Sequence, residues 1–431
     1  ADAPDASKST EELILWLESS FRWGREARKD FELKAVRNLF FWVGDQYVSL
    51  SNDLSRIYSR KITRPAFCET VRTIDSRIPN FTRQQISNCT DSMSEFEAIP
   101  ATSDRADRDA AALATRIIKM REHLDNEDAL RENELLWLMG AGENYRRTSY
   151  DPKKVTVDGV RGDICTESVS FFRCVKHPPS ADAWPPKWVI EFDARPVDDI
   201  QREFGVSVEP EEIDDVMRCI EELAQNVVTG NRGRISGEKK GNSAIVKRMF
   251  YSGARPGYPK GQMIVWANGK ILKRTAFQAD MFPLSRSVWY PVPGRLYPMS
   301  YIDVLADDQS RLNTLVSQLQ EGRNRTLRHD IKATGPMNPV QEVIDQATGQ
   351  KVIRMHEGDM EFVRYNDLPN SARFEYEQIQ HNLNEKGGIN DTNRGNTVKS
   401  NLTATQLQLE REATYSQVAY HMRAIDRHLC Y

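Results

Sequence analysis

The sequence predicts an α+β protein that is mainly helical and carries small β-rich segments. Three observations support this prediction. Apolar residues recur at helical spacing before residue 140, short strand-like runs separated by turns fill 153–273, and 301–330 has the pattern of one long polar helix. The chain has 431 residues, of which 39% are hydrophobic and 28% charged, so two or three packed regions are feasible.

The N-terminal third has the pattern of successive helices. Ser9 is a candidate N-cap, and two acidic residues and an apolar series at helical spacing follow it. The helical pattern resumes over 67–93, and 98–102 forms a short extended break. A long helix is predicted over 103–139, where Gly140 and Gly142 end it in the manner of a glycine C-cap.

The middle of the chain changes to a period of two. Strands are predicted at 153–170 and 188–192, separated by proline-rich turns, and helices at 198–204 and 211–228. Next comes a hairpin of 263–266 and 270–273. Its turn contains Asn268 and Gly269, a pair that supplies the positive φ angles of a type I′ turn. The run 245–251 is expected to pair with this hairpin.

The predicted helix over 301–330 has a single narrow apolar seam near heptad spacing. Its acidic residues lie near the N-terminal end and its arginines near the C-terminal end, which complements the helix macrodipole. About 30 residues extend ~45 Å at 1.5 Å per residue. The seam should therefore pack on one neighbour while water covers the other sides. Its residues are Leu305, Leu312, Leu315, Val316, Leu319 and Leu327.

The C-terminal part mixes both patterns. Hairpin-like runs are predicted at 343–344, 352–355 and 361–364, with turns between them. Helix returns over 371–384, and a last helix is predicted over 402–429.

The sequence shows no active site. A phosphate-binding loop is missing, because 237–243 has the wrong glycine spacing, and the seven histidines and six cysteines form no metal-binding motif. No cofactor is expected. No apolar stretch approaches the ~20 residues that cross a bilayer, and the polar start lacks a signal pattern, so a soluble intracellular chain without membrane contact is expected.

Glu191, Asp193 and the pair Asp198-Asp199 could supply carboxylates to a metal-dependent nuclease, although acidic residues at helix starts commonly serve as caps.

The formal net charge of −3 provides no global basic field for gripping DNA. Two local clusters could still contact nucleic acid. One is the glycine-rich loop 231–242, which could equally be a solvated loop. The other lies at the C-terminal end of the long helix, where basic residues could simply complement the helix end. The first cluster contains Arg232, Arg234, Lys239 and Lys240, and the second contains Arg323, Arg325, Arg328 and Lys332.

Five segments, in their order along the chain, carry a resemblance to a known family. They are the aromatic step Phe-Phe-Trp-Val-Gly-Asp-Gln-Tyr at 40–47, the helix, strand and acid-rich start at 71–104, the stretch 135–146, the run 291–318 and the threonine-rich 400–406. Together they resemble the portal proteins of tailed double-stranded-DNA bacteriophages, most closely those of short-tailed phages. The run 291–318 is the strongest match, because polar residues recur there among apolar ones as in the family's entry into a stem helix.

This resemblance implies a structural protein rather than an enzyme. It implies a ring, expected to be dodecameric, that forms a DNA channel at one capsid vertex for packaging and ejection, after assembly in the host cytoplasm. Its expected partners are terminase, head–tail adaptor and tail proteins, the major capsid protein and weakly held, non-specific double-stranded DNA.

The resemblance also implies a division of the chain. The expected regions are a wing at 1–198, a possible first stem helix at 199–229, a clip with a β-hairpin at 230–298, a stem helix at 299–330, a channel-facing loop with wing strands and a helix at 331–401, and the start of a crown helix at 402–431.

Specific residues follow from this division. Leu305, Leu312, Leu315 and Leu319 would form the stem interface between subunits. Arg323, Arg325, Arg328 and Lys332 would face DNA. The clip surface that meets the motor or adaptor would include Arg232, Arg234, Lys239, Lys240, Asn268 and Gly269.

Two alternatives to the portal stay open from the sequence. Another virion component, such as a head–tail adaptor, would also assemble as a ring but would lack a clip hairpin between two stem helices. A metal-dependent nuclease would instead use Glu191, Asp193 and neighbouring carboxylates.

Overall fold

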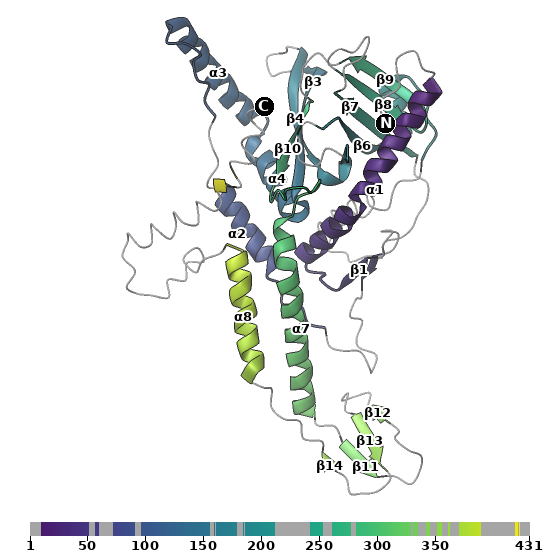
Figure 1. Cartoon of the computed structure of the whole chain (residues 1–431), viewed down its shortest axis with the longest axis vertical. Coiled ribbons are helices and arrows are strands. Elements are labelled where there is room, and N and C mark those ends of the chain that lie inside the picture. Colours follow the sequence, from purple (N-terminus) through teal and green to yellow (C-terminus); the bar gives the residue numbers. More distant parts are fainter. Residues whose placement is uncertain are drawn as a thin grey trace.

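The structure is a computed structural model and confirms a mixed α+β fold (Figure 1). An α/β body carries two paired helices that extend away from it toward a small β-sheet. The structure describes residues 10–50, 57–59, 72–90, 96–155, 159, 161–178, 184, 186–211, 242–252, 261–276, 282–328, 331–334, 342–344, 351–355, 361–362, 370–388, 419–420 and 422.

The elements follow one another in this order along the chain. They are α1 (Thr10–Val43), β1 (Val48–Leu50), β2 (Ile57–Ser59), α2 (Ile78–Thr90), α3 (Arg105–Leu124), α4 (Glu127–Ala141), β3 (Glu143–Val155), β4 (Arg161–Ser170), a 3-10 turn (Phe171–Arg173), β5 (Cys174–Lys176), β6 (Trp188–Pro196), α5 (Val197–Phe204), β7 (Ser243–Tyr251), β8 (Gln262–Ala267), β9 (Lys270–Ala276), β10 (Leu284–Val288), α7 (Tyr301–Arg328), β11 (Ile331–Thr334), β12 (Glu342–Ile344), β13 (Lys351–Met355), β14 (Glu361–Phe362) and α8 (Asn370–Lys386).

A five-stranded antiparallel sheet, in the order β5-β6-β7-β8-β9, forms one half of the body. Helix α1 crosses one face of it, and a Cβ atom at Gly24 would collide with Val175 of β5, so the helix approaches the sheet closely there. Helix α5 packs on the opposite face through Val197 and Ile200. The apolar side chains between α1 and the sheet include Leu13, Trp16 and Leu17 of the helix and Trp188, Ile190, Phe192, Met249, Ile264 and Trp266 of the sheet.

The predicted hairpin is confirmed within this sheet. Asn268 and Gly269 join β8 to β9 with φ angles of 40° and 72°, and β7 pairs with β8 as expected. The sheet also contains β5 and β6. The expected boundary between a wing at 1–198 and a clip at 230–298 therefore runs through one continuous sheet.

A second sheet, in the order β10-β3-β4, lies beside the first. The strand predicted over 153–170 is confirmed for β4, but its start corresponds to the end of β3, and the first ten residues of β3, from Glu143, were missed. The first residues of β3 are largely polar and charged, and they are buried because ion pairs neutralise them: Arg146 contacts Glu134 at 2.6 Å. A pattern search for apolar residues does not detect such a strand.

Two helix predictions also need correction. The helix predicted over 103–139 is two helices, α3 and α4, separated at Asn126 in the left-handed conformation (φ 52°). The helix predicted over 67–93 begins only at Ile78, and residues 72–77 are extended. By contrast, the glycine stop is confirmed, because Gly142 caps α4 with φ 82°.

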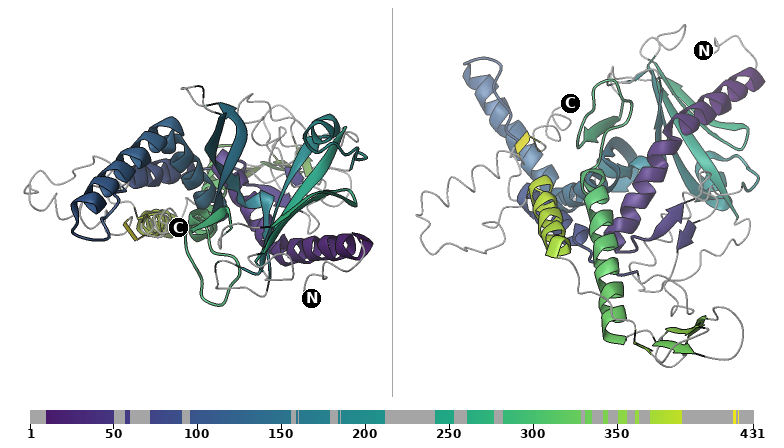
Figure 2. Two further views of the ribbon diagram at one scale, coloured as in Figure 1. Left: turned by 90° about the horizontal axis from the view of Figure 1, so that it is seen from above. Right: turned by 60° about the horizontal axis from the view of Figure 1, so that its bottom comes forward.

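Helices α7 and α8 lie side by side and run in opposite directions (Figures 1 and 2). The small sheet of β11–β14 lies beyond the end of α7, between the two helices in the sequence. We call this sheet the tip. Strands β12 and β13 form the predicted antiparallel pair, whereas β14 pairs with β11 and not with β13, so the second predicted hairpin is wrong.

The core between α7, α8, α2 and α4 includes the apolar seam of α7. Leu305 and Leu312 are 0% exposed and Leu315 is 7% exposed within a single chain, while Leu319 packs against the same cluster. Side chains that are already covered have no surface to offer a second subunit. Leu305, Leu312 and Leu315 belong to the core of the chain itself, whereas Leu319 is only partly buried, and the predicted role of the four leucines between subunits stays a prediction that this burial does not support.

Other predictions lie partly or wholly outside the described residues. The helix predicted over 211–228, the basic loop 231–242 (apart from Asn242) and most of 402–429 belong to this group. No helix among the described residues is long and apolar enough to cross a membrane.

Candidate functional site

The most elaborate polar arrangement in the described chain lies along α7, beside its apolar seam. Gln309, Asn313 and Ser317 are buried and follow one another at intervals of four residues, so they lie in a row on one face of the helix. We call these three residues the polar ladder. These three residues alternate in sequence with the leucines of the seam, but their side chains contact a different segment of the chain.

That neighbour is the extended segment 72–77. The backbone N–H of Arg77 donates to Gln309 Oε1 at 3.1 Å, that of Asp75 to Asn313 Oδ1 at 3.1 Å, and that of Thr73 to Ser317 Oγ at 2.9 Å. Four residues of a helix rise about 6 Å, and two residues of an extended chain span about 6.6 Å. The two spacings agree closely enough for three successive hydrogen bonds.

The polar ladder also connects two of the segments that carry the resemblance described from the sequence. Asn313 Nδ2 donates to Gln46 Oε1 at 2.5 Å, and Gln46 Nε2 donates to the carbonyl of Phe41 and to Ser76 Oγ. Gln46 belongs to the aromatic step 40–47, and Asn313 belongs to the run 291–318. The structure therefore places polar residues of both segments in one contact.

The start of α7 is fixed by a reciprocal cap. Ser300 Oγ accepts the N–H of Asp303, and Asp303 Oδ2 accepts the N–H of Ser300, both at 3.0 Å. Asn38 of α1 donates to both side chains at 2.9 Å. The helix is thus held to the body at its first turn and along its first half.

Helix α8 is fixed to α7 at the same end. The Tyr301 hydroxyl donates to the carbonyl of Gly387 at 2.9 Å, and Lys386 contacts Asp308 at 2.5 Å. The far ends of both helices are free of the body and lead to the tip (Figure 1). The two paired helices are thus fixed to the body at one end and have a small sheet at the other.

The basic residues predicted to contact DNA lie at this far end. Arg323 is exposed on the last turns of α7. Arg325 and Arg328 belong to α7 and Lys332 to β11, but their side chains lie outside the described residues. The basic loop residues Arg232, Arg234, Lys239 and Lys240 lie outside the described residues altogether.

The predicted clip turn lies elsewhere, at the end of the five-stranded sheet. Asn268 Nδ2 donates to the carbonyl of Glu209 at 3.2 Å, and Lys270 Nζ donates to that of Ser207 at 2.9 Å. The turn therefore packs on the segment that follows α5, and the structure does not bring Asn268 and Gly269 near the tip.

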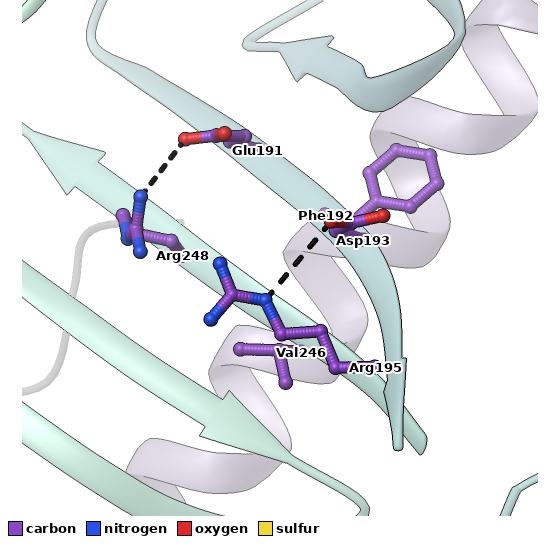
Figure 3. A pocket seen from close by; sticks show the side chains of 6 residues that line it. All are labelled: Glu191, Phe192, Asp193, Arg195, Val246 and Arg248. Carbon is purple, nitrogen blue, oxygen red and sulfur yellow. Dashed lines mark hydrogen bonds and ion pairs between the residues drawn. The ribbon is translucent and has the colours of Figure 1, made fainter. Parts of the chain in front are cut away.

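The carboxylates of the nuclease alternative are already neutralised (Figure 3). Glu191 contacts Arg147 at 2.5 Å and Arg248 at 3.2 Å, while Asp193 lies 3.7 Å from Arg173 and 4.0 Å from Arg195. The pocket between them has a volume of about 10 Å³, room for about one water. Within the described residues no group of carboxylates, histidines or cysteines could hold a metal ion, so the geometry gives the nuclease no support.

The comparisons with known proteins add nothing to this geometry. No protein-family model matches the chain, and no curated protein matches it.

One further buried cluster braces the body without resembling an active site. Glu143 is 0% exposed and contacts Lys176 at 2.8 Å and Arg286 at 3.0 Å. Burial raises the pKa of Glu143, but the positive charges of Arg286 and Lys176 outweigh this effect and lower it to about 2. Burial lowers the pKa of Lys176 to about 7, and the positive charge of Arg286 adds to this effect, while Glu143 opposes it. The cluster joins β3, β5 and β10.

Proposed function

We propose that this chain is the protomer of a viral portal, a ring-shaped channel at one capsid vertex through which DNA is packaged and ejected. The observation that carries the proposal is the arrangement α7–tip–α8. Two helices of 28 and 17 residues pack against each other, are fixed to the body at one end, and lead to a small sheet at the other. The portal resemblance implies a β-rich clip between two stem helices, and the succession α7–tip–α8 has the same order of parts, although the resemblance assigned the clip to 230–298.

The polar ladder is the second line of support. Separate segments of the chain carry the portal resemblance, and a chance resemblance gives no reason for polar residues of two such segments to meet. Gln46 and Asn313 are nevertheless hydrogen-bonded across 267 residues of sequence. Their contact supports the interpretation that both segments resemble the portal family for the same structural reason.

The proposal moves the clip. The resemblance assigned it to 230–298, but strands β7–β9 of that range belong to the sheet under α1. The tip, at 331–362, is the β-rich element between two paired helices, and we assign the clip to it. A head–tail adaptor was expected to lack such an element, so the tip also favours a portal over that alternative.

The proposed partners follow from this assignment. The tip would face the terminase motor during packaging and the head–tail adaptor and tail proteins afterwards, while the body would contact the major capsid protein. DNA would pass through the ring with weak, non-specific contacts, because a conduit that bound phosphates tightly would stall the DNA that slides through it.

The test is the mass and shape of the purified full chain over a range of concentrations, measured by light scattering and negative-stain imaging. We expect rings with a central hole, at about twelve times the mass of one chain, since a heterologous contact that closes by rotation gives such particles. A largest particle that is a compact dimer or tetramer without a hole at every concentration would overturn the portal.

A second arm tests the clip. A variant in which a short glycine–serine linker replaces residues 331–369 should still form rings but lose co-sedimentation with the terminase motor. Retained motor binding by this variant would refute the assignment of the tip.

A further inference from the structure

Helix α3 differs from the other long helices in that none of its residues is buried. One side of it faces the body: Thr115 Oγ1 accepts the N–H of Ala98 at 3.0 Å, and Arg121 contacts Asp163 at 2.6 Å. The rest of the helix projects away from the body in every view (Figures 1 and 2). The opposite side of α3 is therefore open to solvent.

That open side is apolar along its whole length. The apolar residues follow one another at alternating intervals of four and three, which is the spacing of a coiled-coil seam. The four large side chains are 59%, 49%, 54% and 53% exposed in sequence order. A solvated helix face is normally polar, so a continuous apolar stripe of this kind indicates a docking surface. The stripe consists of Ala106, Ala110, Leu113, Ile117, Met120 and Leu124.

The sizes of these side chains suit a second copy of the same helix in the opposite direction. Small residues occupy the first two positions and large ones the last four. Antiparallel pairing about residue 115 would place Ala106 against Leu124, Ala110 against Met120, and Leu113 against Ile117 of the second copy. Every layer of the pair then has a similar volume. Parallel pairing would instead stack alanine on alanine at one end and Leu124 on Leu124 at the other.

One pair of charged residues beside the stripe also agrees with the antiparallel direction. Asp107 and Asp109 flank its first half, and Arg116, Arg121 and His123 flank its second half. Antiparallel pairing would bring Asp109 beside His123 of the second copy, whereas Arg121 is already paired with Asp125 and Asp163 of its own chain.

We propose that α3 is a homotypic docking helix, which pairs antiparallel with α3 of a second copy of this chain. The same surface is used on both sides, so the contact is closed and produces a dimer. A ring needs a different, heterologous contact. The inference therefore does not rest on the proposed portal function, and the two can fail separately.

The first experiment measures the mass of the full chain by light scattering in a dilution series. A species of twice the monomer mass, distinct from any ring, should become more populated as the concentration of the full chain rises. Ile117→Glu should shift this transition to a concentration higher by about tenfold or more, because pairing would bury a carboxylate without a partner. Leu15→Glu is the matched control, since Leu15 is an exposed residue of another helix (71%) and lies off the stripe.

The second experiment tests the register. A variant with both Leu113→Cys and Ile117→Cys should form inter-chain disulfides, whereas Ile117→Cys alone should not, because two copies of residue 117 lie a helical turn apart in the antiparallel pair. Efficient cross-linking of the single variant would overturn the antiparallel pair.

Three results with the Ile117→Glu variant, from its mass and its melting temperature, would also overturn the proposal. An unchanged mass transition in Ile117→Glu would exclude the stripe as a contact. A lower melting temperature with an unchanged mass would mean that the stripe packs within its own chain. Loss of rings in Ile117→Glu with no dimer at any concentration would assign the stripe to a heterologous contact. Rings that persist while the dimer is lost would support both proposals.

Discussion

Asn313 is the central residue of the polar ladder, and its amide satisfies partners on two other segments. Its Oδ1 accepts the N–H of Asp75 and its Nδ2 donates to Gln46. Because Asn313 is 2% exposed, water cannot replace these bonds when the side chain is shortened.

We therefore expect Asn313→Ala to lower the free energy of unfolding by about 2–3 kcal/mol, through buried groups left without partners. Urea unfolding of the full chain would measure this loss. Thr314→Ala, at the exposed neighbouring position, should change stability by less than about 0.5 kcal/mol. Equal effects of both variants would contradict the importance of the polar ladder.

Glu143 gives the fold a dependence on acid. Its pKa is lowered to about 2 in the folded chain from an ordinary value of 4.5, so its contribution to stability is complete above about pH 4.5. That contribution, about 3 kcal/mol, is lost as the pH falls from about 4.5 toward 2. Thermal unfolding between pH 6 and 2.5 should show a steeper loss of stability in the wild type than in Glu143→Gln. Parallel curves would contradict this assignment.

At the level of elements, the leucines of α7 illustrate why the sequence could not decide their role. An apolar seam at heptad spacing has the same appearance whether it packs on α8 and α2 or on another subunit. The sequence predicted the seam and the helix correctly, but only the structure shows that Leu312 and Leu315 are covered within one chain.

Leu315→Glu should consequently unfold the monomer or lower its stability severely, because a carboxylate would enter the core without a partner. Circular dichroism and thermal unfolding would measure this effect. Gln318→Glu, at an exposed position of the same helix, should leave stability nearly unchanged. A Leu315→Glu chain that is fully folded but fails to assemble would restore the subunit-interface interpretation.

Two helix-capping glycines allow a matched comparison. Gly142 and Gly205 end α4 and α5 with φ angles of 82° and 71°. A Cβ at Gly142 would lie 2.9 Å from the backbone of Met299, whereas a Cβ at Gly205 would meet nothing within 4 Å. Gly205→Ala should therefore cost about 1 kcal/mol, the price of the left-handed conformation alone, and Gly142→Ala clearly more. Equal losses in urea unfolding would show that the contact at Met299 relaxes freely.

Local chemistry decided which elements were predictable. Asn268-Gly269 and Gly142 impose their conformations through their own backbones, so both the hairpin and the end of α4 were predicted. The extended segment 72–77 was predicted as helix because its partner, the polar ladder, lies more than 200 residues away in sequence. The first residues of β3 were missed for a related reason, since their charges are paired by residues of other elements.

The candidate site was predictable only in part. The sequence identified the polar residues of α7 and the glutamine at 46 as resembling a family pattern, but nothing in it indicated that they contact one another. The proposed position of the clip depends on which β-rich segment lies between two paired helices. That is a property of three-dimensional arrangement, which strand patterns alone do not contain.

At the level of the whole molecule, the near-neutral charge of the chain limits how it can bind DNA. With a net charge of −3, only local groups such as Arg323 provide attraction. We expect weak, non-specific binding to duplex DNA that disappears as salt is raised, because such binding depends on counterion release.

Fluorescence anisotropy of a labelled duplex over a salt series would measure this dependence. Arg323→Ala should make the salt dependence shallower, whereas Arg373→Ala, which removes the same charge from α8, should not. Tight binding that persists at high salt, or equal effects of both variants, would contradict a role of the far end of α7 in contacting DNA.

The polar ladder has a consequence for motion of α7. Its three side chains differ in length, from Gln309 through Asn313 to Ser317, yet each accepts a backbone N–H at 2.9–3.1 Å. The extended segment must therefore approach the helix axis from Arg77 toward Thr73, like the side of a wedge. If α7 slid along the segment by one turn, a long side chain would meet a space between helix and segment that is too narrow for it, or a short side chain would meet a space too wide for it to reach across. The ladder thus admits a single register, and a force applied to the tip would be transmitted to the body as a rigid displacement rather than absorbed by sliding.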